Sequence, residues 1–153
     1  MFDITGRAYR FANVVGPNQT HGVAFDFIRK LKKDPCHLSI LGDGTQSKSY
    51  IYVEDIIDAI LVSDRLSKEK FDFFNIATGD YIAVNEIANI VVEEMGLKKV
   101  IFQFSGGDRG WKGDVPIVRF DLSKIYSFGW QAKLNSQEAI KESVRAMLKS
   151  NLN

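Results

Sequence analysis

Stretches of residues that suit buried strands alternate along this chain with stretches that suit amphipathic helices. Each strand-like stretch is rich in β-branched and aromatic residues and lies near a turn signal. The expected strands are Arg7–Pro17, Leu38–Leu41, Tyr50–Val53, Phe73–Ala77 and Val100–Phe104, and we expect the first of them to be mostly buried. Strands that alternate with helices in this way favour an α/β fold over an all-β fold.

The expected helices carry apolar residues at helical spacing, which gives each of them a face for burial. They begin after Gly22, at Glu54–Asp55, after Asp80, near Asp121 and at Ser136, which we interpret as the cap of the last helix. Their apolar residues are Val23, Phe27, Ile28 and Leu31, then Ile56, Ile57, Ile60 and Leu61, then Ile87, Ala88, Val91 and Met95, and finally Ile140, Val144, Met147 and Leu148. Arg29, Lys30, Lys32 and Lys33 lie around the other side of the first helix, and we interpret them as a solvated face.

Composition sets limits on the class of protein. The chain has 153 residues, of which 45% are hydrophobic and three are proline, which suits one globular domain. Its formal net charge of +1 does not point to nucleic acid or a membrane as a partner. Cys36, His21 and His37 make neither an internal disulfide nor a zinc ligand set. Because there is no apolar run of about 18 residues and no charged-then-apolar leader, we expect a soluble, cytoplasmic, metal-free protein.

The sequence lacks the patterns of a complete nicotinamide-dependent enzyme. A dinucleotide-binding fold needs a glycine fingerprint between its first strand and first helix, so that the backbone can approach the pyrophosphate. The glycine-rich stretch Ser105–Pro116 follows a strand, but we interpret it as an extended loop because it also contains Trp111 and Lys112. No tyrosine is followed four residues later by a lysine, and neither histidine lies in a nucleophile elbow.

Polar residues at strand ends and in loops are the candidate binding groups, because α/β proteins usually bind ligands there. Lys48 follows the expected loop Gly42–Ser47 and lies between two serines, which together offer donors suited to a phosphate. An exposed loop lysine is an equal alternative for Lys48.

The stretch Asp108–Asp114 combines two cations, an aromatic ring and two carboxylates on a glycine-containing backbone. Arg109 and Lys112 would face a diphosphate, Trp111 would stack on a ring, and a carboxylate would accept from sugar hydroxyls. This mixture suits a sugar nucleotide. The alternative is a surface turn that contains its own Arg–Asp pair.

Six motifs occur in order and span nearly the whole chain. They are Arg10–Pro17, Gly42–Gln46, Ser49–Asp55, Phe74–Gly79, Gly113–Pro116 and Phe128–Trp130. With these motifs the chain resembles the C-terminal part of UDP-glucose 4-epimerases and related extended short-chain dehydrogenases, especially archaeal-type members.

The resemblance implies that Asn13 contacts the diphosphate of a nucleotide sugar. The family commonly has Arg-Asp where this chain has Lys48-Ser49, and a lysine meets a phosphate as a point charge without a bidentate fork. In the family's later Arg-x-Gly-Asp motif the aspartate is Asp114, but Trp111 holds the arginine position, so Arg109 or Lys112 would substitute. The expected substrate-binding residues are therefore Asn13, Lys48, Tyr50, Arg109, Trp111, Lys112 and Asp114, with no catalytic, cofactor-binding or metal-binding residue.

The resemblance also implies a division of the fold. Arg7–Val14 and Phe73–Ala77 would be late strands of a Rossmann-like parallel sheet, and the remainder would form the small mixed α/β substrate-binding domain. Residues 1–153 would thus be a single C-terminal substrate-binding portion. The early strands, the glycine fingerprint and the catalytic residues would belong to an N-terminal NAD-binding portion absent from this chain, whose abrupt start reads like a cut through a larger protein.

The expected function is the sugar-nucleotide-binding portion of an NAD-dependent epimerase, which would not be catalytic alone. NAD is implied for the complete enzyme and not for this chain by itself, and a UDP-hexose is the expected ligand. Two alternatives remain open: a stand-alone nucleotide-sugar-binding module, and a fragment whose exposed strand edges pair into a homodimer or a domain-swapped oligomer. The sequence does not distinguish a 4-epimerase from dehydratase, decarboxylase or reductase relatives.

Overall fold

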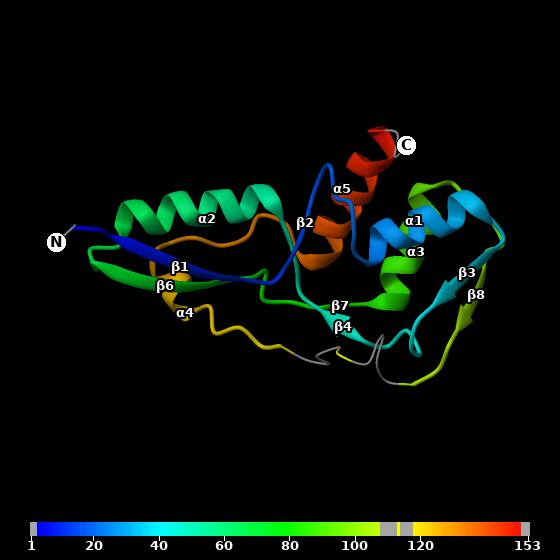
Figure 1. The fold of residues 1–153 in the computed structure, drawn as a ribbon, viewed down its shortest axis with the longest axis horizontal. Coiled ribbons are helices and arrows are strands. Elements are labelled where there is room, and N and C mark those ends of the chain that lie inside the picture. The colour runs from blue at the N-terminus through cyan, green and yellow to red at the C-terminus, as the bar shows by residue number, and fades with distance from the viewer. Residues whose placement is uncertain (1–2, 108–112, 114–117, 151–153) are drawn as a thin grey trace.

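The computed structural model describes residues 3–107, 113 and 118–150, and its elements form two groups at opposite ends of an elongated molecule (Figure 1). One group comprises β1 (Gly6–Phe11), α2 (Val53–Leu66), β6 (Phe71–Ile76) and α4 (Ser123–Ser127). The other comprises α1 (Val23–Lys33), β3 (His37–Ile40), α3 (Val84–Glu94) and β8 (Ile101–Phe104). Between them lie β2 (Asn13–Val15), β4 (Ser47–Lys48), β5 (Tyr50–Tyr52), β7 (Ile82–Ala83) and α5 (Ser136–Lys149).

The described residues form three parallel strand pairs: β1–β6, β2–β5 and β3–β8. A fourth pair, β4–β7, is antiparallel. Parallel strands joined through helices confirm the predicted α/β class, with late strands of a Rossmann-like sheet (β1–β6) beside a smaller mixed α/β region.

The chain changes strand partner immediately after β1. The Ala12 N–H still donates to the Ile76 carbonyl at 2.9 Å, but the Asn13 N–H donates to the Ser49 carbonyl at 3.1 Å. The prediction of one mostly buried strand over Arg7–Pro17 is therefore wrong. Two strands with different partners occupy this segment, and three of the six β1 side chains are exposed.

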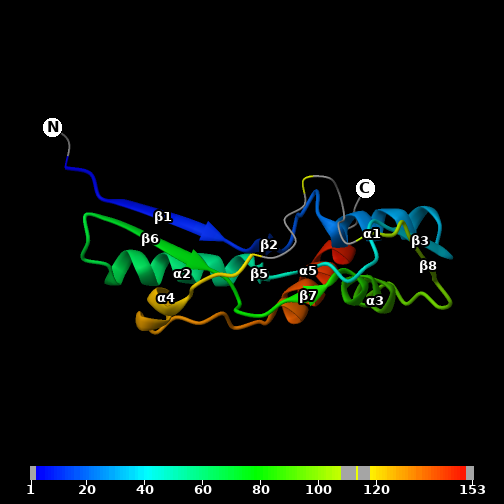
Figure 2. The same ribbon diagram turned by 90° about the horizontal axis from the view of Figure 1, so that it is seen from below.

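The β1–β6 pair is covered on one face by α2 (Figure 2). Phe74, fully buried, packs there against the α2 residues Ile56 and Ala59. The opposite face leaves Phe71 and Phe73 exposed, although the Arg10 guanidinium and the Lys124 ammonium lie over the Phe73 ring, 5.0 and 4.8 Å from its centre. Exposure of this face explains why β1 is less buried than its composition predicts.

The helix α2 turns a second apolar surface to solvent. Of its four predicted apolar residues, Ile56 is buried and Ile60 is half-buried, whereas Ile57 and Leu61 are 51% and 63% exposed. The inner face is completed instead by Ala59 and polar residues.

A second core lies among α1, α3, α5 and the β3–β8 pair. It includes Ile28 and Leu31 of α1, Ile87 and Val91 of α3, and Met147 of α5, all almost completely buried. The helical spacing predicted each of these residues as part of an apolar face.

The cap of the last helix lies one residue earlier than expected. Asn135, not Ser136, is its cap: the Asn135 side chain accepts from the Glu138 N–H at 2.9 Å, and Glu138 accepts from the Asn135 N–H at 2.9 Å. This reciprocal pair is a capping box. Ser136 is completely buried and bonds elsewhere, with its hydroxyl accepting from the Tyr50 N–H at 3.0 Å and donating to Asp80 Oδ1 at 2.8 Å.

Asp72 is a buried carboxylate on β6 that ties α4 to the strand. It pairs with the Lys124 ammonium and accepts from the Ser67 hydroxyl at 2.7 Å and the Phe73 N–H at 2.9 Å. Burial alone would raise the pKa of Asp72, but these partners outweigh it and hold the pKa below the ordinary aspartate value. Among the residues described, no helix has the length and apolar character needed to cross a membrane.

Candidate functional site

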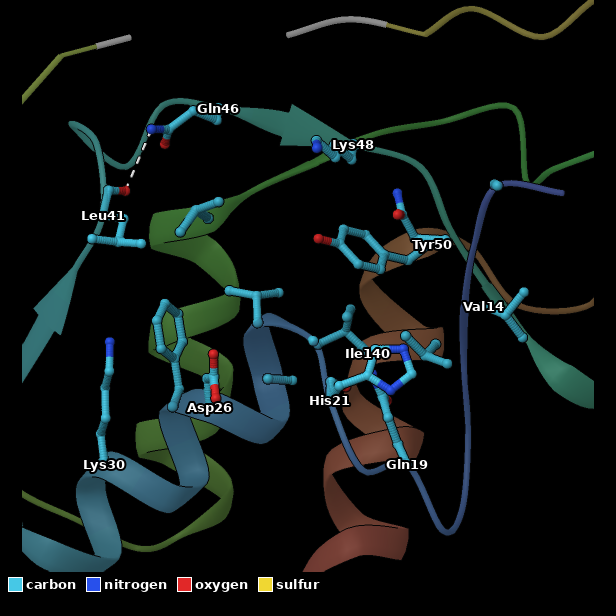
Figure 3. Close-up of a pocket in the computed structure, with 18 residues that line it drawn as sticks. Val14, Gln19, His21, Asp26, Lys30, Leu41, Gln46, Lys48, Tyr50 and Ile140 are labelled. Atoms are coloured by element: carbon cyan, nitrogen blue, oxygen red, sulfur yellow. Dashed lines mark hydrogen bonds between the residues drawn. The ribbon is translucent and has the colours of Figure 1, made fainter. Parts of the chain in front are cut away.

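A cleft of about 730 Å³ opens beside the point where the chain changes strand partner (Figure 3). Its walls come from β2, the loop after β2, α1, β4 and β5. Open α/β sheets bind ligands where neighbouring strands diverge, because the divergence leaves a crevice. Asn13, Lys48 and Tyr50, three of the residues expected to bind substrate, all line this cleft.

Asn13 lies at the divergence itself. Its side-chain Nδ2 donates to the Ser49 carbonyl at 3.0 Å, the same oxygen that accepts from its backbone N–H. This double contact fixes the side chain against the segment that carries Lys48. An amide has two N–H groups and a carbonyl oxygen, so one donor and the acceptor remain for a ligand.

Lys48 belongs to β4, where it is paired with Ile82 and half-buried. The alternative of an exposed loop lysine is therefore wrong. Its neighbour Ser49 is buried, and the Ser49 hydroxyl pairs with the Thr78 hydroxyl at 2.9 Å rather than facing a ligand. Of the donor cluster predicted around Lys48, the ammonium is the member that lines the cleft.

Tyr50 presents its ring to the same cleft (Figure 3). The residue is only 9% exposed, and its backbone N–H is held by the Ser136 hydroxyl at the start of α5. The position of this ring therefore depends on the contact between β5 and α5.

A second cavity of about 240 Å³ shares part of the same wall. Ala12, Asn13 and Lys48 line both cavities, and Phe11, Ser49, Val118 and Phe120 complete the smaller one. Asn13 and Lys48 thus lie between the two cavities. A ligand that filled both cavities would contact these two residues with its middle part.

The contribution of α1 to the cleft was not predicted from the sequence. Asp26, Phe27 and Lys30 line the cleft, and the Lys30 ammonium donates to the Ser39 carbonyl at 2.8 Å. The interpretation of Lys30 as part of a solvated face is wrong, since this residue is half-buried. The sequence did contain an indication of this position, because Lys30 follows Phe27 by three residues and so shares its side of the helix.

Gln46 is a second cleft residue that no sequence pattern marked for binding. It is 7% exposed and lines the cleft, and its Nε2 donates to the Leu41 carbonyl at 3.4 Å. In the described part of the chain its Oε1 has no hydrogen-bond partner.

Four of the expected substrate-binding residues lie outside the described residues. They are Arg109, Trp111, Lys112 and Asp114.

The residues present do not fit a complete NAD site. Gly106 forms a β-bridge with Gly42, and Gly107 lies in a bend. Both follow β8, whereas a dinucleotide fingerprint lies between the first strand and the first helix of its sheet. The chemistry of the cleft is therefore that of a polar binding site, with an ammonium, an amide and a phenol along an apolar wall.

Residues 1–77 match the model of the NAD-dependent epimerase/dehydratase family, which is half of the chain. A Methanocaldococcus jannaschii protein named "Putative UDP-glucose 4-epimerase" is 31% identical and covers 99% of this chain, which spans 48% of that relative. GDP-mannose 3,5-epimerase of Arabidopsis thaliana is 26% identical and covers 92% of this chain and 37% of its own length.

A crystal structure of a UDP-galactose 4-epimerase has the same fold, with a TM-score of 0.81 and 33% identity. That likeness covers 95% of this chain and 46% of the other. The chain spans about half the length, or less, of the relatives it matches. The match to the family model over residues 1–77, a range that includes β1, β2, α1 and the Lys48–Tyr50 segment, shows that this chain belongs to the NAD-dependent epimerase/dehydratase family.

Proposed function

We propose that this chain is the nucleotide-sugar-binding portion of an NAD-dependent nucleotide-sugar epimerase, and that it does not catalyse the reaction alone. The observation that carries the proposal is the meeting of two cavities at Asn13 and Lys48. A nucleotide sugar has two bulky ends joined by a diphosphate. Two cavities with an ammonium and an amide between them complement that shape and charge.

The larger cavity suits the nucleoside. Its volume of about 730 Å³ falls within the roughly 300–1,000 Å³ of ordinary ligand pockets. The diphosphate would lie at the Lys48 ammonium and the remaining Asn13 amide donor. The hexose would enter the smaller cavity, and Arg109, Trp111, Lys112 and Asp114 remain the proposed further contacts.

NAD binding and catalysis would require the part of the relatives that this chain does not span. The family is NAD-dependent by description, yet this chain has no dinucleotide fingerprint. Phe71 and Phe73 on the face of the β1–β6 pair opposite α2, and Ile57 and Leu61 on the outer side of α2, offer two exposed apolar surfaces for further chain to cover. Both surfaces support self-association into a dimer or a domain-swapped oligomer, which light scattering would detect. A strictly monomeric mass at high concentration would count against that association.

Calorimetry with UDP and UDP-glucose tests the binding proposal. We expect heat of binding for both ligands, and we expect Lys48→Met to weaken both several-fold because the diphosphate loses its cation. Lys33→Met is the matched control, since Lys33 is an exposed lysine outside the cleft and its loss should leave both affinities unchanged. Absence of heat at millimolar ligand would refute binding by this chain.

The second part of the proposal concerns catalysis. With NAD and UDP-galactose supplied, the isolated chain should give no UDP-glucose in a coupled assay. Turnover by the isolated chain would refute this claim. Binding without turnover would also be the behaviour of a stand-alone binding module, and regained epimerisation on addition of a separately expressed NAD-binding half would favour the epimerase portion over that module.

A further inference from the structure

The end of the large cleft farthest from the small cavity carries its own pair of charged groups. Asp26 and Lys30 extend from α1 on the side of the cleft that also carries Leu41 and Gln46 (Figure 3). Neither Asp26 nor Lys30 lines the smaller cavity, whereas Asn13 and Lys48 line both. If the diphosphate lies at Asn13 and Lys48, the nucleobase faces Asp26 and Lys30.

The Lys30 ammonium is held in place before any ligand binds. Its Nζ donates to the Ser39 carbonyl at 2.8 Å and lies 5.9 Å from the centre of the Phe27 ring. An ammonium has three N–H donors and no acceptor. One donor is used by Ser39, so two remain for groups inside the cleft, and they can pair only with acceptors.

The surroundings of Lys30 suit a flat, partly apolar ring. Leu41 lines the cleft with 58% of its surface exposed, and Phe27 of α1 lines the same cleft. Among the residues that the structure describes, the Gln46 Oε1 is a buried acceptor without a hydrogen-bond partner in the same wall, and the Gln46 amide makes one long hydrogen bond, to the Leu41 carbonyl. Buried polar groups are rarely left unpaired, so this amide is a second indication that the wall is completed by a polar ligand.

Resting on the function proposed above, we propose that Lys30 selects the nucleobase by donating to an exocyclic carbonyl oxygen. The oxygen in question is at C4 of uracil and thymine and at C6 of guanine, whereas cytosine and adenine carry an amino group at these positions. The Asp26 carboxylate, one helical turn before Lys30, accepts from the ring N–H that neighbours the carbonyl in the keto bases. In cytosine or adenine, the amino group at this position is itself a hydrogen-bond donor, so it cannot pair with the Lys30 ammonium.

Competition between UDP and CDP isolates this contact, because the two nucleotides have the same diphosphate and ribose. We expect the unmodified chain to bind UDP at least about tenfold more tightly than CDP in calorimetry, a factor that corresponds to one hydrogen bond gained or mispaired. Lys30→Met should bring the two affinities within about twofold of each other. Lys33→Met, one helical turn after Lys30 at an exposed lysine that does not line the cleft, should preserve the full ratio.

The outcomes separate the two proposals. If neither nucleotide binds, the proposed function fails and this inference fails with it. If both bind but the unmodified chain shows no preference for UDP, only the inference fails. If Lys30→Met weakens both nucleotides equally, Lys30 acts on the phosphate and the inference is again overturned. Lys48→Met should weaken both nucleotides by similar factors while the preference for UDP persists.

Discussion

Replacing Ser136 by alanine tests whether the start of α5 holds the wall of the cleft. The Ser136 hydroxyl is completely buried, accepts from the Tyr50 N–H at 3.0 Å and donates to Asp80 Oδ1 at 2.8 Å. Alanine removes one oxygen atom without adding any group that clashes. The change is therefore a loss of hydrogen bonds with little loss of packing.

The magnitude follows from what is left unpaired. In Ser136→Ala the Tyr50 N–H loses the acceptor that the hydroxyl provides, and an orphaned buried donor costs about 1–3 kcal/mol. Asp80 loses less, because both of its carboxylate oxygens also accept from the Ser136 backbone N–H at 3.1 Å. We therefore expect the free energy of unfolding to fall by about 2 kcal/mol.

Urea denaturation followed by circular dichroism measures this change. With a urea m-value of about 2 kcal/mol/M, the midpoint should fall by roughly 1 M, and the m-value itself should stay the same. Ser127→Ala is the matched control, since the Ser127 hydroxyl makes an exposed bond to the Lys124 carbonyl and its loss should cost no more than about 0.5 kcal/mol. The UDP affinity of Ser136→Ala should also fall several-fold, because Tyr50 loses its support.

A result in which Ser136→Ala and Ser127→Ala are equally stable would refute this reasoning. Tyr50 would then find another acceptor, and the contact between β5 and α5 would not determine the position of the ring.

Three further predictions concern the rest of the fold. Because the pKa of Asp72 is lowered in the folded chain, the Asp72 carboxylate stabilises the fold fully above the ordinary pKa of 3.8. This stabilisation is lost as the pH falls through the folded pKa. The free energy of unfolding, measured by urea denaturation at pH 7, 5 and 3, should therefore fall less with pH in Asp72→Asn than in the unmodified chain. Gly44→Ala should lower the free energy of unfolding by about 1–3 kcal/mol more than Gly96→Ala. Both glycines have positive φ, but only at Gly44 would a Cβ lie 2.5 Å from the Phe104 ring. Equal losses in the two variants would contradict this clash. Leu61→Ser should reduce concentration-dependent association in light scattering without lowering the urea midpoint, since Leu61 is exposed on α2. Unchanged association would contradict a role for the outer surface of α2.

Sequence periodicity predicted the helices well because burial of one helical face is a local pattern. The apolar spacing gave the α1 and α3 faces, and Ile28, Leu31 and Ile87 are indeed in the core. The same reasoning overestimated the burial of β1 and of Leu61 on α2, because burial depends on which neighbour covers a face and the local sequence does not record that neighbour.

The candidate site was only half predictable. Lys48 was marked by its place between two serines after a loop, and Asn13 and Tyr50 by a family resemblance; the structure brings all three to one cleft. Lys30 was assigned to solvent because a lysine among other cations on a helix is usually exposed. Its burial results from the approach of β3, whose Ser39 carbonyl accepts from it, and that contact joins two elements that no local pattern connects.

The cleft and the exposed face of the β1–β6 pair lie in different parts of the fold, and under the proposed function they would serve binding and catalysis respectively. The walls of the cleft rest on α1, α3 and α5, whose shared core includes Ile28 and Met147. The β1–β6 pair instead leaves one face with Phe71 and Phe73 open. A nucleotide site supported by its own core can persist when the open face has no partner, whereas chemistry that needs groups across that face cannot. Binding of UDP should therefore tolerate polar substitution at Phe71, while recovery of epimerisation with a separately supplied NAD-binding half should not.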